Sequence, residues 1–257
     1  MEIDWALVGV AFGVGGLVGL TGVGAGAIMT PVLVGFFGVS LPVAIATDLV
    51  FATLTKLVAV PVHHRQGSIN WTLARRMWLG SIPGALVGVG IVLLLVSREQ
   101  TSWLMWPLSA IIFATAVVFV SRAVRRQFVE QRIGFVGSRW PGLATIGGLG
   151  IGTSVSLTSV GAGALGMALL VSISPPETQP KELVGTDLIH AIPIAIIGGL
   201  AYGFSGLVSA ELLVGMLIGS LPGVSAGAFL TGKIPGRMIS GALAIVLFAA
   251  LYFLIRA

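Results

Sequence analysis

Long apolar runs follow one another along almost the entire chain, and this feature restricts the fold more than any other. A run of about 20 apolar residues is long enough to cross the hydrocarbon core of a bilayer as a helix. The polar stretches between the runs are too short to form a separate soluble domain. The sequence therefore predicts an all-α polytopic membrane protein. The apolar runs lie near residues 5–36, 43–61, 77–96, 103–121, 141–173, 183–203, 207–231 and 238–255.

The composition agrees with this class and excludes several others. Charged residues make up 9% of the chain, against about a quarter in soluble domains, and the mean hydropathy is +1.06. The net charge of +5 comes from Lys and Arg in short loops between the runs, which is typical of membrane proteins rather than nucleic-acid-binding proteins. We therefore expect no nucleic-acid partner. Because the chain has no Cys and only three His, we expect no metal site, and we expect no cofactor.

Three short motifs occur twice, in the same order, in the two halves of the chain. Glycine and alanine richness could produce one such match by chance, but three matches in register indicate that each half is one structural unit, as in many transporters. The matched pairs are LTGVGAGA at 20–27 with LTSVGAGA at 157–164, ATDL at 46–49 with GTDL at 185–188, and GSIPG at 80–84 with GSLPG at 219–223.

The positions of basic residues indicate how the halves are oriented. Arg65, Arg75 and Arg76 follow the second run of the first half, whereas the matching region of the second half has no basic residue. Lys233 and Arg237 follow the third run of the second half. The basic loops therefore swap between the halves, and all of them are cytoplasmic if each glycine-rich run forms a helical hairpin.

This distribution predicts two inverted repeats of about five helical elements each, with 8–10 membrane segments and both termini outside. The first repeat covers residues 1–121, a basic cytoplasmic linker covers 122–140, and the second repeat covers 141–257. The alternative is a single crossing by each run, which gives eight spans and parallel halves.

The two glycine-rich segments are candidates for a substrate site. Both lie in runs too long for one ordinary span, and glycine permits unusual backbone angles, so we expect glycine-broken or re-entrant helices near the midplane. A helix that starts there, near Ala25 or Ala162, has free N–H groups that attract anions. The alternative is an unbroken helix with a small-residue packing surface. The predicted substrate-binding residues here are Thr21, Gly22, Gly24, Ala25, Gly26, Thr158, Ser159, Gly161, Ala162 and Gly163.

Three charged residues lie inside apolar runs, namely Asp48, Lys56 and Asp187. Charges at this depth are costly and mark functional sites by default. Asp48 and Asp187 are related by the repeat and follow Thr47 and Thr186 in the same motif. We assign these four Thr and Asp residues to coupling or to architecture, because a symmetric pair serves proton coupling and the capping of broken helices equally well.

Lys56 and His190 break the symmetry, since their repeat partners are Ala195 and Phe51. A site for one asymmetric substrate needs such a difference, so we add Lys56 and His190 to the predicted substrate-binding residues. His190 lies three residues after Asp187 and shares its helix face. The alternatives are a hydrogen-bonded packing histidine and a lysine that snorkels from a helix ending near Pro61.

Two further patterns have structural interpretations. Gly80, Gly84 and Gly88, and again Gly219, Gly223 and Gly227, have the spacing of small residues that lets membrane helices pack closely. We expect residues 63–65, with the sequence HHR, to form an interfacial loop rather than a metal site.

The glycine-rich segments, the ATDL and GTDL motifs, the GS-x-PG motifs and the two-half layout resemble the sulfite exporter family (TauE/SafE), also called the toluene-sulfonate uptake permeases. The resemblance covers almost the whole chain. It implies secondary transport of sulfite, sulfoacetate, a related sulfonate or another small anion, in bacteria usually across the inner (plasma) membrane. The family's glycine-rich segments correspond to residues 20–27 and 157–164, with Ser159 in the place of Gly22.

The expected function is therefore secondary transport of a small organic or sulfur-containing anion by alternating access. An anion channel, a membrane-embedded enzyme and a structural membrane subunit are the alternatives. No nucleophile–base set supports an enzyme, and no nucleotide-binding motif supports ATP drive. The expected partners are a small anionic solute and the lipid bilayer, and a homodimer is left open.

Overall fold

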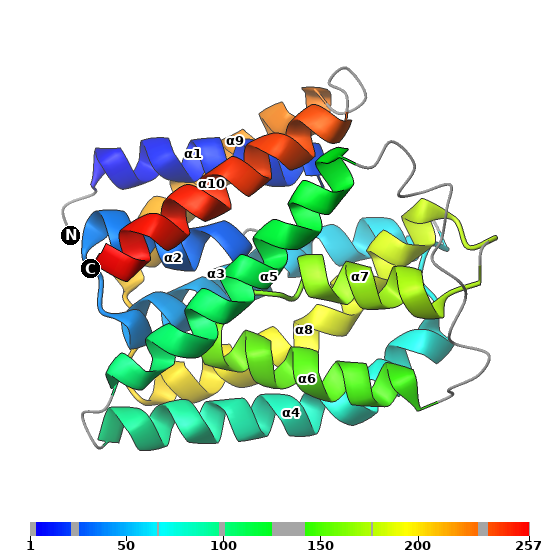
Figure 1. Cartoon of the computed structure of the whole chain (residues 1–257), viewed down its shortest axis with the longest axis horizontal. Helices are drawn as coiled ribbons and strands as arrows, with labels where there is room; N and C mark the ends of the chain where they lie inside the picture. Colours follow the sequence, from blue (N-terminus) through cyan, green and yellow to red (C-terminus); the bar gives the residue numbers. More distant parts are fainter. Residues whose placement is uncertain are drawn as a thin grey trace.

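The computed structural model describes residues 4–21, 26–65, 67–97, 101–124, 142–175, 177–230 and 236–256. These residues form ten α-helices and one short 3-10 helix, without a strand. The helices run roughly along the long axis of the molecule (Figure 1). The predicted all-α class is confirmed.

The helices follow the predicted apolar runs. The first half contains α1 (Trp5–Thr21), α2 (Gly26–Phe37), α3 (Leu41–Arg65), α4 (Trp71–Ser97), η1 (Thr101–Leu104) and α5 (Met105–Val124). The second half contains α6 (Leu143–Thr158), α7 (Ala164–Ile173), α8 (Pro180–Phe204), α9 (Ala210–Leu230) and α10 (Gly236–Arg256).

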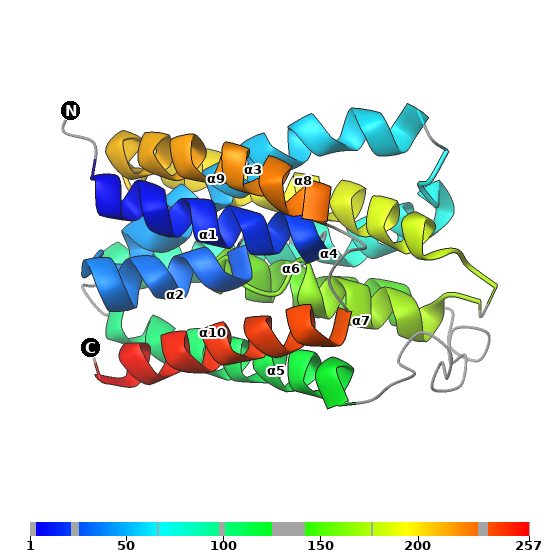
Figure 2. The same ribbon diagram turned by 90° about the horizontal axis from the view of Figure 1, so that it is seen from above.

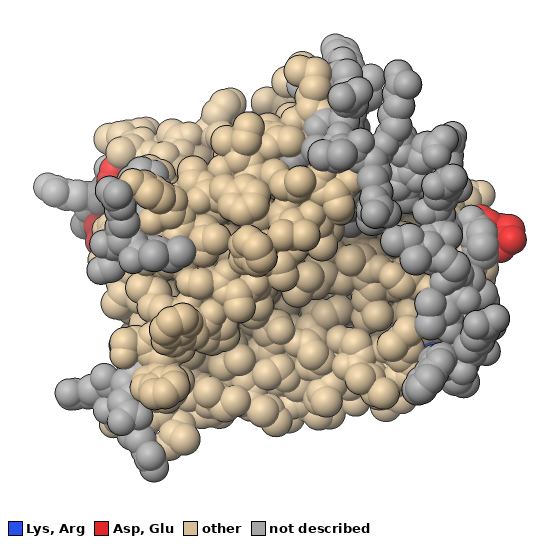
Figure 3. Space-filling model, viewed as in Figure 1, with Lys and Arg blue, Asp and Glu red and all other residues tan. Residues whose placement is uncertain are grey.

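The outer surface of the described chain is that of a membrane protein. Large apolar side chains are exposed on it, such as Leu86 and Ile245, and the charged side chains visible in Figure 3 lie at the two ends of the molecule. A broad apolar band with polar ends matches a bilayer with its two aqueous faces. Within the described residues, four helices are long and apolar enough to cross it, namely Trp71–Ser97, Ser102–Ser121, Lys181–Phe204 and Ala210–Gly227.

Each glycine-rich run forms two helices instead of one. The first run gives α1 and α2, and the second gives α6 and α7. Figure 2 shows that α1 and α2 run in opposite directions. With 12 and 10 residues, α2 and α7 rise only about 18 and 15 Å, whereas the hydrocarbon core measures about 30 Å. The expectation of interrupted helices is confirmed, and the alternative of unbroken helices is wrong.

The direction of each helix follows from the position of the chain ends. The N- and C-termini lie at one end of the molecule, while the end of α5 and the start of α6 lie at the other (Figure 1). The predicted linker 122–140 has only its first three residues within the described chain, in the last turn of α5. Inversion of the two repeats stays a prediction, which these directions support.

Neighbouring helices pair in a pattern that relates the two halves. α1 packs along α9 and α4 along α6, while α3 packs on α8 and α5 on α10. Exchanging each helix for its repeat partner turns the first pair into the second and leaves the last two unchanged. A Cβ on Gly80 or Gly84 would overlap the backbone of α6, and one on Gly219 or Gly223 would overlap that of α1. The predicted close helix packing is confirmed.

One predicted boundary is wrong. α3 continues through Pro61 to Arg65, so residues 63–65 belong to its final turn and not to a loop. Proline removes one hydrogen bond, but membrane helices tolerate it where neighbouring helices support the backbone. α4 and α8 likewise contain an internal proline, Pro83 and Pro193.

Candidate functional site

The chain reverses direction in five residues between α6 and α7. Ser159 ends α6 in the left-handed conformation, with a φ of 58°, and is the only non-glycine residue of the described chain with a positive φ. Gly161 follows with a φ of 109°, which side chains disfavour. Val160 N donates a 3.1 Å hydrogen bond to Thr158 Oγ1. The turn therefore depends on the predicted SVGAG sequence.

The start of α7 leaves a group of backbone donors without acceptors. Leu165 N and Gly166 N both donate to Gly161 O, at 3.0 and 3.2 Å. The N–H groups of residues 161–164 donate no hydrogen bond within the described chain, although all four residues are buried. Free amides at a helix N-terminus carry partial positive charge. They form the kind of site that binds an anion.

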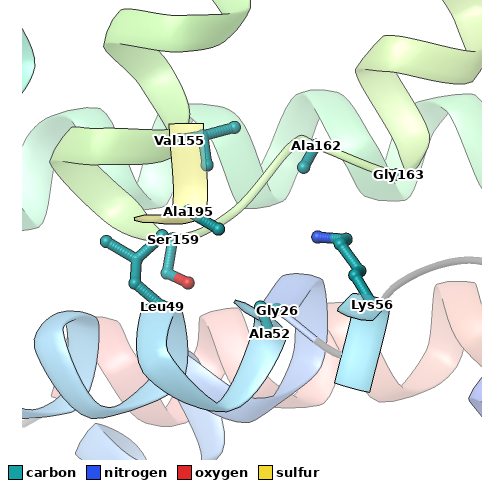
Figure 4. A pocket seen from close by; sticks show the side chains of 9 residues that line it. All are labelled: Gly26, Leu49, Ala52, Lys56, Val155, Ser159, Ala162, Gly163 and Ala195. Carbon is teal, nitrogen blue, oxygen red and sulfur yellow. The ribbon is translucent and has the colours of Figure 1, made fainter. Parts of the chain in front are cut away.

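A small pocket adjoins these amides, between α3 and the turn from α6 to α7 (Figure 4). Lys56 extends from α3, and its amino group points toward Ala162 and Gly163, while Ser159 Oγ points into the pocket. The empty space is about 300 Å³ including the part open to solvent, but only about 10 Å³ of it is enclosed. The lining residues are Gly26, Leu49, Ala52, Lys56, Val155, Ser159, Ala162, Gly163 and Ala195.

The lysine does not snorkel. α3 runs nine residues beyond it, to Arg65, and Lys56 is only 8% exposed. The charges of Asp48 and Asp187 both act on its ammonium group. The side chain therefore stays inside the protein, where the two carboxylates offset part of the cost of burying it.

The two repeat-related aspartates contact the two short helices. Thr30 Oγ1 of α2 donates a 2.7 Å hydrogen bond to Asp48 Oδ2, and the same carboxylate oxygen lies near Gly26. Asp187 lies against Gly166 in the first turn of α7. Each carboxylate therefore sits beside the positive end of a helix dipole, as the architectural interpretation predicts.

The threonines of the same motifs connect the halves away from the pocket. Thr47 Oγ1 accepts a hydrogen bond from Ser209 N, and Thr186 Oγ1 accepts one from Asn70 N. Ser209 lies just before α9 and Asn70 just before α4, so each threonine bonds the start of a long helix in the other half. Thr47 and Thr186 thus have structural partners.

His190 is fully buried on α8. Neither ring nitrogen has a hydrogen-bond partner within the described residues, so the described chain does not provide the bonds of a hydrogen-bonded packing histidine. Trp78 Nε1 donates a 3.2 Å hydrogen bond to the His190 backbone oxygen instead. Lys56 lies within electrostatic range of the ring.

The first glycine-rich segment is described only in part. α1 ends at Thr21 and α2 begins at Gly26, one residue after the predicted start. Gly22, Gly24 and Ala25 lie outside the described residues, as does the Thr21 side chain. Gly26 packs directly on the Ser159 backbone oxygen, where a Cβ would approach to 2.5 Å. The start of α2 therefore meets the turn between α6 and α7 at the pocket.

Three neighbours of the site were not predicted from the sequence. Thr30 bonds Asp48, and Ala195 lines the pocket. Tyr202 Oη donates a 2.7 Å hydrogen bond to Ser156 O near the end of α6. Thr30 and Tyr202 have no motif around them, whereas Ala195 could have been found as the repeat partner of Lys56.

Comparison with known proteins decides the family. A sequence model of the family described as "Sulfite exporter TauE/SafE" matches residues 7–254. The chain belongs to the TauE/SafE family. The expected resemblance is thereby confirmed over nearly the whole length of the protein.

Two relatives of this TauE/SafE protein come from Bacillus subtilis. The "Probable membrane transporter protein YjnA" is 32% identical over 234 residues, which cover 87% of this chain and 89% of the relative. The "Probable membrane transporter protein YdhB" is 25% identical over 241 residues, covering 91% and 93%. No solved structure matches the chain.

Family, relatives and apolar helices agree on the general class. The TauE/SafE protein is an integral membrane protein of a transporter family. Both relatives are bacterial, in agreement with the predicted inner (plasma) membrane.

Proposed function

We propose that this TauE/SafE protein is a secondary transporter that binds a small organic or sulfur-containing anion at the interruption between α6 and α7. The single observation that supports this most strongly is the set of four buried backbone N–H groups at residues 161–164, which have no acceptor in the described chain. Buried donors of this kind are costly unless a ligand or water accepts their hydrogen bonds.

Two side chains complete the proposed site. Among the described lining residues, Lys56 supplies the one formal positive charge, and its amino group faces Ala162 and Gly163 (Figure 4). Ser159 Oγ points into the pocket (Figure 4) and lies beside the Asp48 carboxylate, from where its hydroxyl can turn to donate to the same ligand. A sulfite or sulfonate group presents three oxygens, which suits several donors converging from one side.

The size of the pocket limits the ligand. The enclosed space is about 10 Å³, roughly the room for one water molecule, so even a small anion such as sulfite or sulfoacetate needs the surrounding helices to move apart. Since α2 and α7 both begin at this pocket, a relative movement of the two hairpins would expose it to one side of the membrane or to the other. Alternating access in this chain then needs a hairpin movement around a fixed site.

Binding of sulfite and sulfoacetate to the purified protein tests the site. Lys56→Met removes the charge but keeps the length of the side chain. We expect its affinity for both anions to fall roughly 10- to 100-fold, because a hydrogen bond to a charged group contributes about 1.5–3 kcal/mol. Lys181→Met is the matched control, since Lys181 is exposed at the start of α8. Equal affinities in all three proteins would refute the site.

Flux measurements in proteoliposomes test the transport mechanism. A secondary transporter shows saturable uptake and counterflow, in which unlabelled anion on one side accelerates entry of labelled anion from the other. A channel shows flux that does not saturate and no counterflow. Saturation with counterflow would support alternating access, and its absence from protein that binds the anion would contradict it.

A further inference from the structure

Among the described buried side chains of the site, negative charges outnumber positive ones. Of the described Asp, Glu, Lys, Arg and His side chains, only Asp48, Lys56, Asp187 and His190 are buried. Two carboxylates and one ammonium group leave one excess negative charge when His190 is neutral. Adding an anion increases this excess, and uncompensated charge inside a membrane protein is expensive.

We propose that the anion enters its site together with one proton, and that Asp48 carries this proton. The inference rests on the anion site proposed above. The proton comes from water on the side from which the anion enters, and it forms an O–H bond at the Asp48 carboxylate. Release of the anion reverses the step, so flux of the anion is coupled to flux of protons in the same direction.

The position of Asp48 selects it over Asp187. Asp48 Oδ2 lies near Gly26, which lines the pocket, and a Cβ on Gly26 would lie 3.4 Å both from this oxygen and from Ser159 Oγ. Within Asp48, Oδ1 is the oxygen that would accept the proton, because Oδ2 already accepts a hydrogen bond from Thr30 Oγ1. The contact with the pocket, and not this oxygen, distinguishes Asp48 from Asp187. Asp187 instead contacts Gly166, which is not a lining residue of the pocket.

The surroundings of Asp48 contain few other candidates. From its own helix it faces Lys56, and from α8 the buried groups Asp187 and His190 are nearby. α2 contributes Thr30, and neither α2 nor α6 has a titratable residue within its bounds. Glu211 on α9 is exposed. A proton on His190 would add a second cation beside Lys56, which disfavours it as the carrier.

A metal cation fits the site less well than a proton. No group of three or more acidic or histidine side chains in the described chain could hold a metal ion. Lys56 also repels a cation at this place. Thr30 donates its hydroxyl proton to Asp48 Oδ2, which leaves Oδ1 as the oxygen of Asp48 that would take up a proton.

Proton uptake on binding tests this inference directly. Purified protein in weakly buffered solution with a pH indicator is mixed with sulfoacetate above neutral pH, where both acidic groups of the ligand stay ionised. If sulfoacetate does not bind, sulfite is used above the pH at which it loses its second proton. We expect about one proton taken up per anion bound, and an affinity that falls roughly tenfold per pH unit.

Two variants locate the proton. Asp48→Asn resembles the protonated carboxyl group, so we expect it to bind the anion without proton uptake and without the pH dependence. Asp187→Asn is the repeat-related control and should still take up the proton. The number of protons that the wild-type protein takes up tests the coupling even if neither variant folds.

The outcomes separate this inference from the proposed function. If neither anion binds to the wild-type protein, the proposed function fails and this inference fails with it. Anion binding without proton uptake, or binding that requires sodium instead, overturns only the proposed coupling to a proton. Uptake that survives Asp48→Asn but not Asp187→Asn overturns the assignment to Asp48.

Discussion

The backbone N–H of Ser209 donates a 3.0 Å hydrogen bond to Thr47 Oγ1, which ties the start of α9 to α3 in the other half of the chain. Their repeat partners make the equivalent contact. Asn70 N, just before α4 in the first half, donates a 2.9 Å hydrogen bond to Thr186 Oγ1 on α8 in the second half. Asn70 and Ser209 in turn accept hydrogen bonds from the first turns of α4 and α9 through their side chains. One motif therefore holds both halves together at two equivalent places.

Replacing these threonines should affect stability rather than binding. Thr47→Val and Thr186→Val each leave a backbone donor without its partner, and we expect each to destabilise the protein by about 1–2 kcal/mol. Thermal unfolding in detergent measures the loss, and sulfoacetate titration measures binding. A variant that keeps its stability but loses proton uptake would show instead that the threonine acts in coupling.

The contact between Gly26, at the start of α2, and the Ser159 backbone should not tolerate a side chain. The Cβ of Gly26→Ala would lie 2.5 Å from Ser159 O, so the start of α2 must move away from Ser159 and the pocket wall must move with it. We expect at least a tenfold loss of anion affinity. Gly13→Ala on α1 is the control, because its Cβ would meet nothing within 4 Å. Unchanged binding in Gly26→Ala would mean that this contact does not shape the site.

The packing of α4 on α6 offers a matched pair of glycines two residues apart. A Cβ on Gly152 would overlap the Ser81 backbone, whereas one on Gly150 would meet nothing within 4 Å. We expect Gly152→Ala to destabilise the protein by about 1–3 kcal/mol through overpacking. Gly150→Ala should be neutral, or stabilising by up to about 1 kcal/mol, because alanine favours the helix. Similar unfolding temperatures for both variants would contradict the close packing of this pair.

A lysine at position 195, the repeat partner of position 56, should replace the positive charge of Lys56 in the pocket. Ala195 is the repeat partner of Lys56 and lines the same pocket. We expect Lys56→Ala to bind anions weakly and the double variant Lys56→Ala/Ala195→Lys to recover at least part of the affinity. Titration of both variants with sulfite compares them. If Ala195→Lys gives no recovery in protein that folds normally, then the pocket recognises the exact position of Lys56 and not only its charge.

The sequence predicted the broken helices because two local signals coincided, namely a run too long for one span and a glycine-rich stretch inside it. The interruption at residues 159–163 was predicted to within two residues for this reason. The start of α7 at Ala164 instead of Ala162 reflects the extra residues that the left-handed turn at Ser159 and Gly161 requires. The end of α3 was misplaced because Pro61 resembles a helix stop, although α3 continues to Arg65.

Contacts between distant residues could not be predicted in the same way. Thr30 and Asp48 are 18 residues apart, and Tyr202 and Ser156 are 46 apart. Nothing in the local pattern around Thr30 or Tyr202 marks either residue, so only the fold brings the partners together. The repeat did contain unused information, since aligning Lys56 with Ala195 indicated a pair that faces one cavity.

The ten-residue length of α7 also determines how the membrane voltage acts on the solute. The helix rises about 15 Å, so its free amides lie roughly half a hydrocarbon thickness from the surface that α7 reaches. A monoanion that moves from that surface to the amides crosses roughly half of the electrical drop, or about 1.2 kcal/mol for each 100 mV. A proton that travels with the anion cancels this work, and entry from that side then becomes insensitive to voltage.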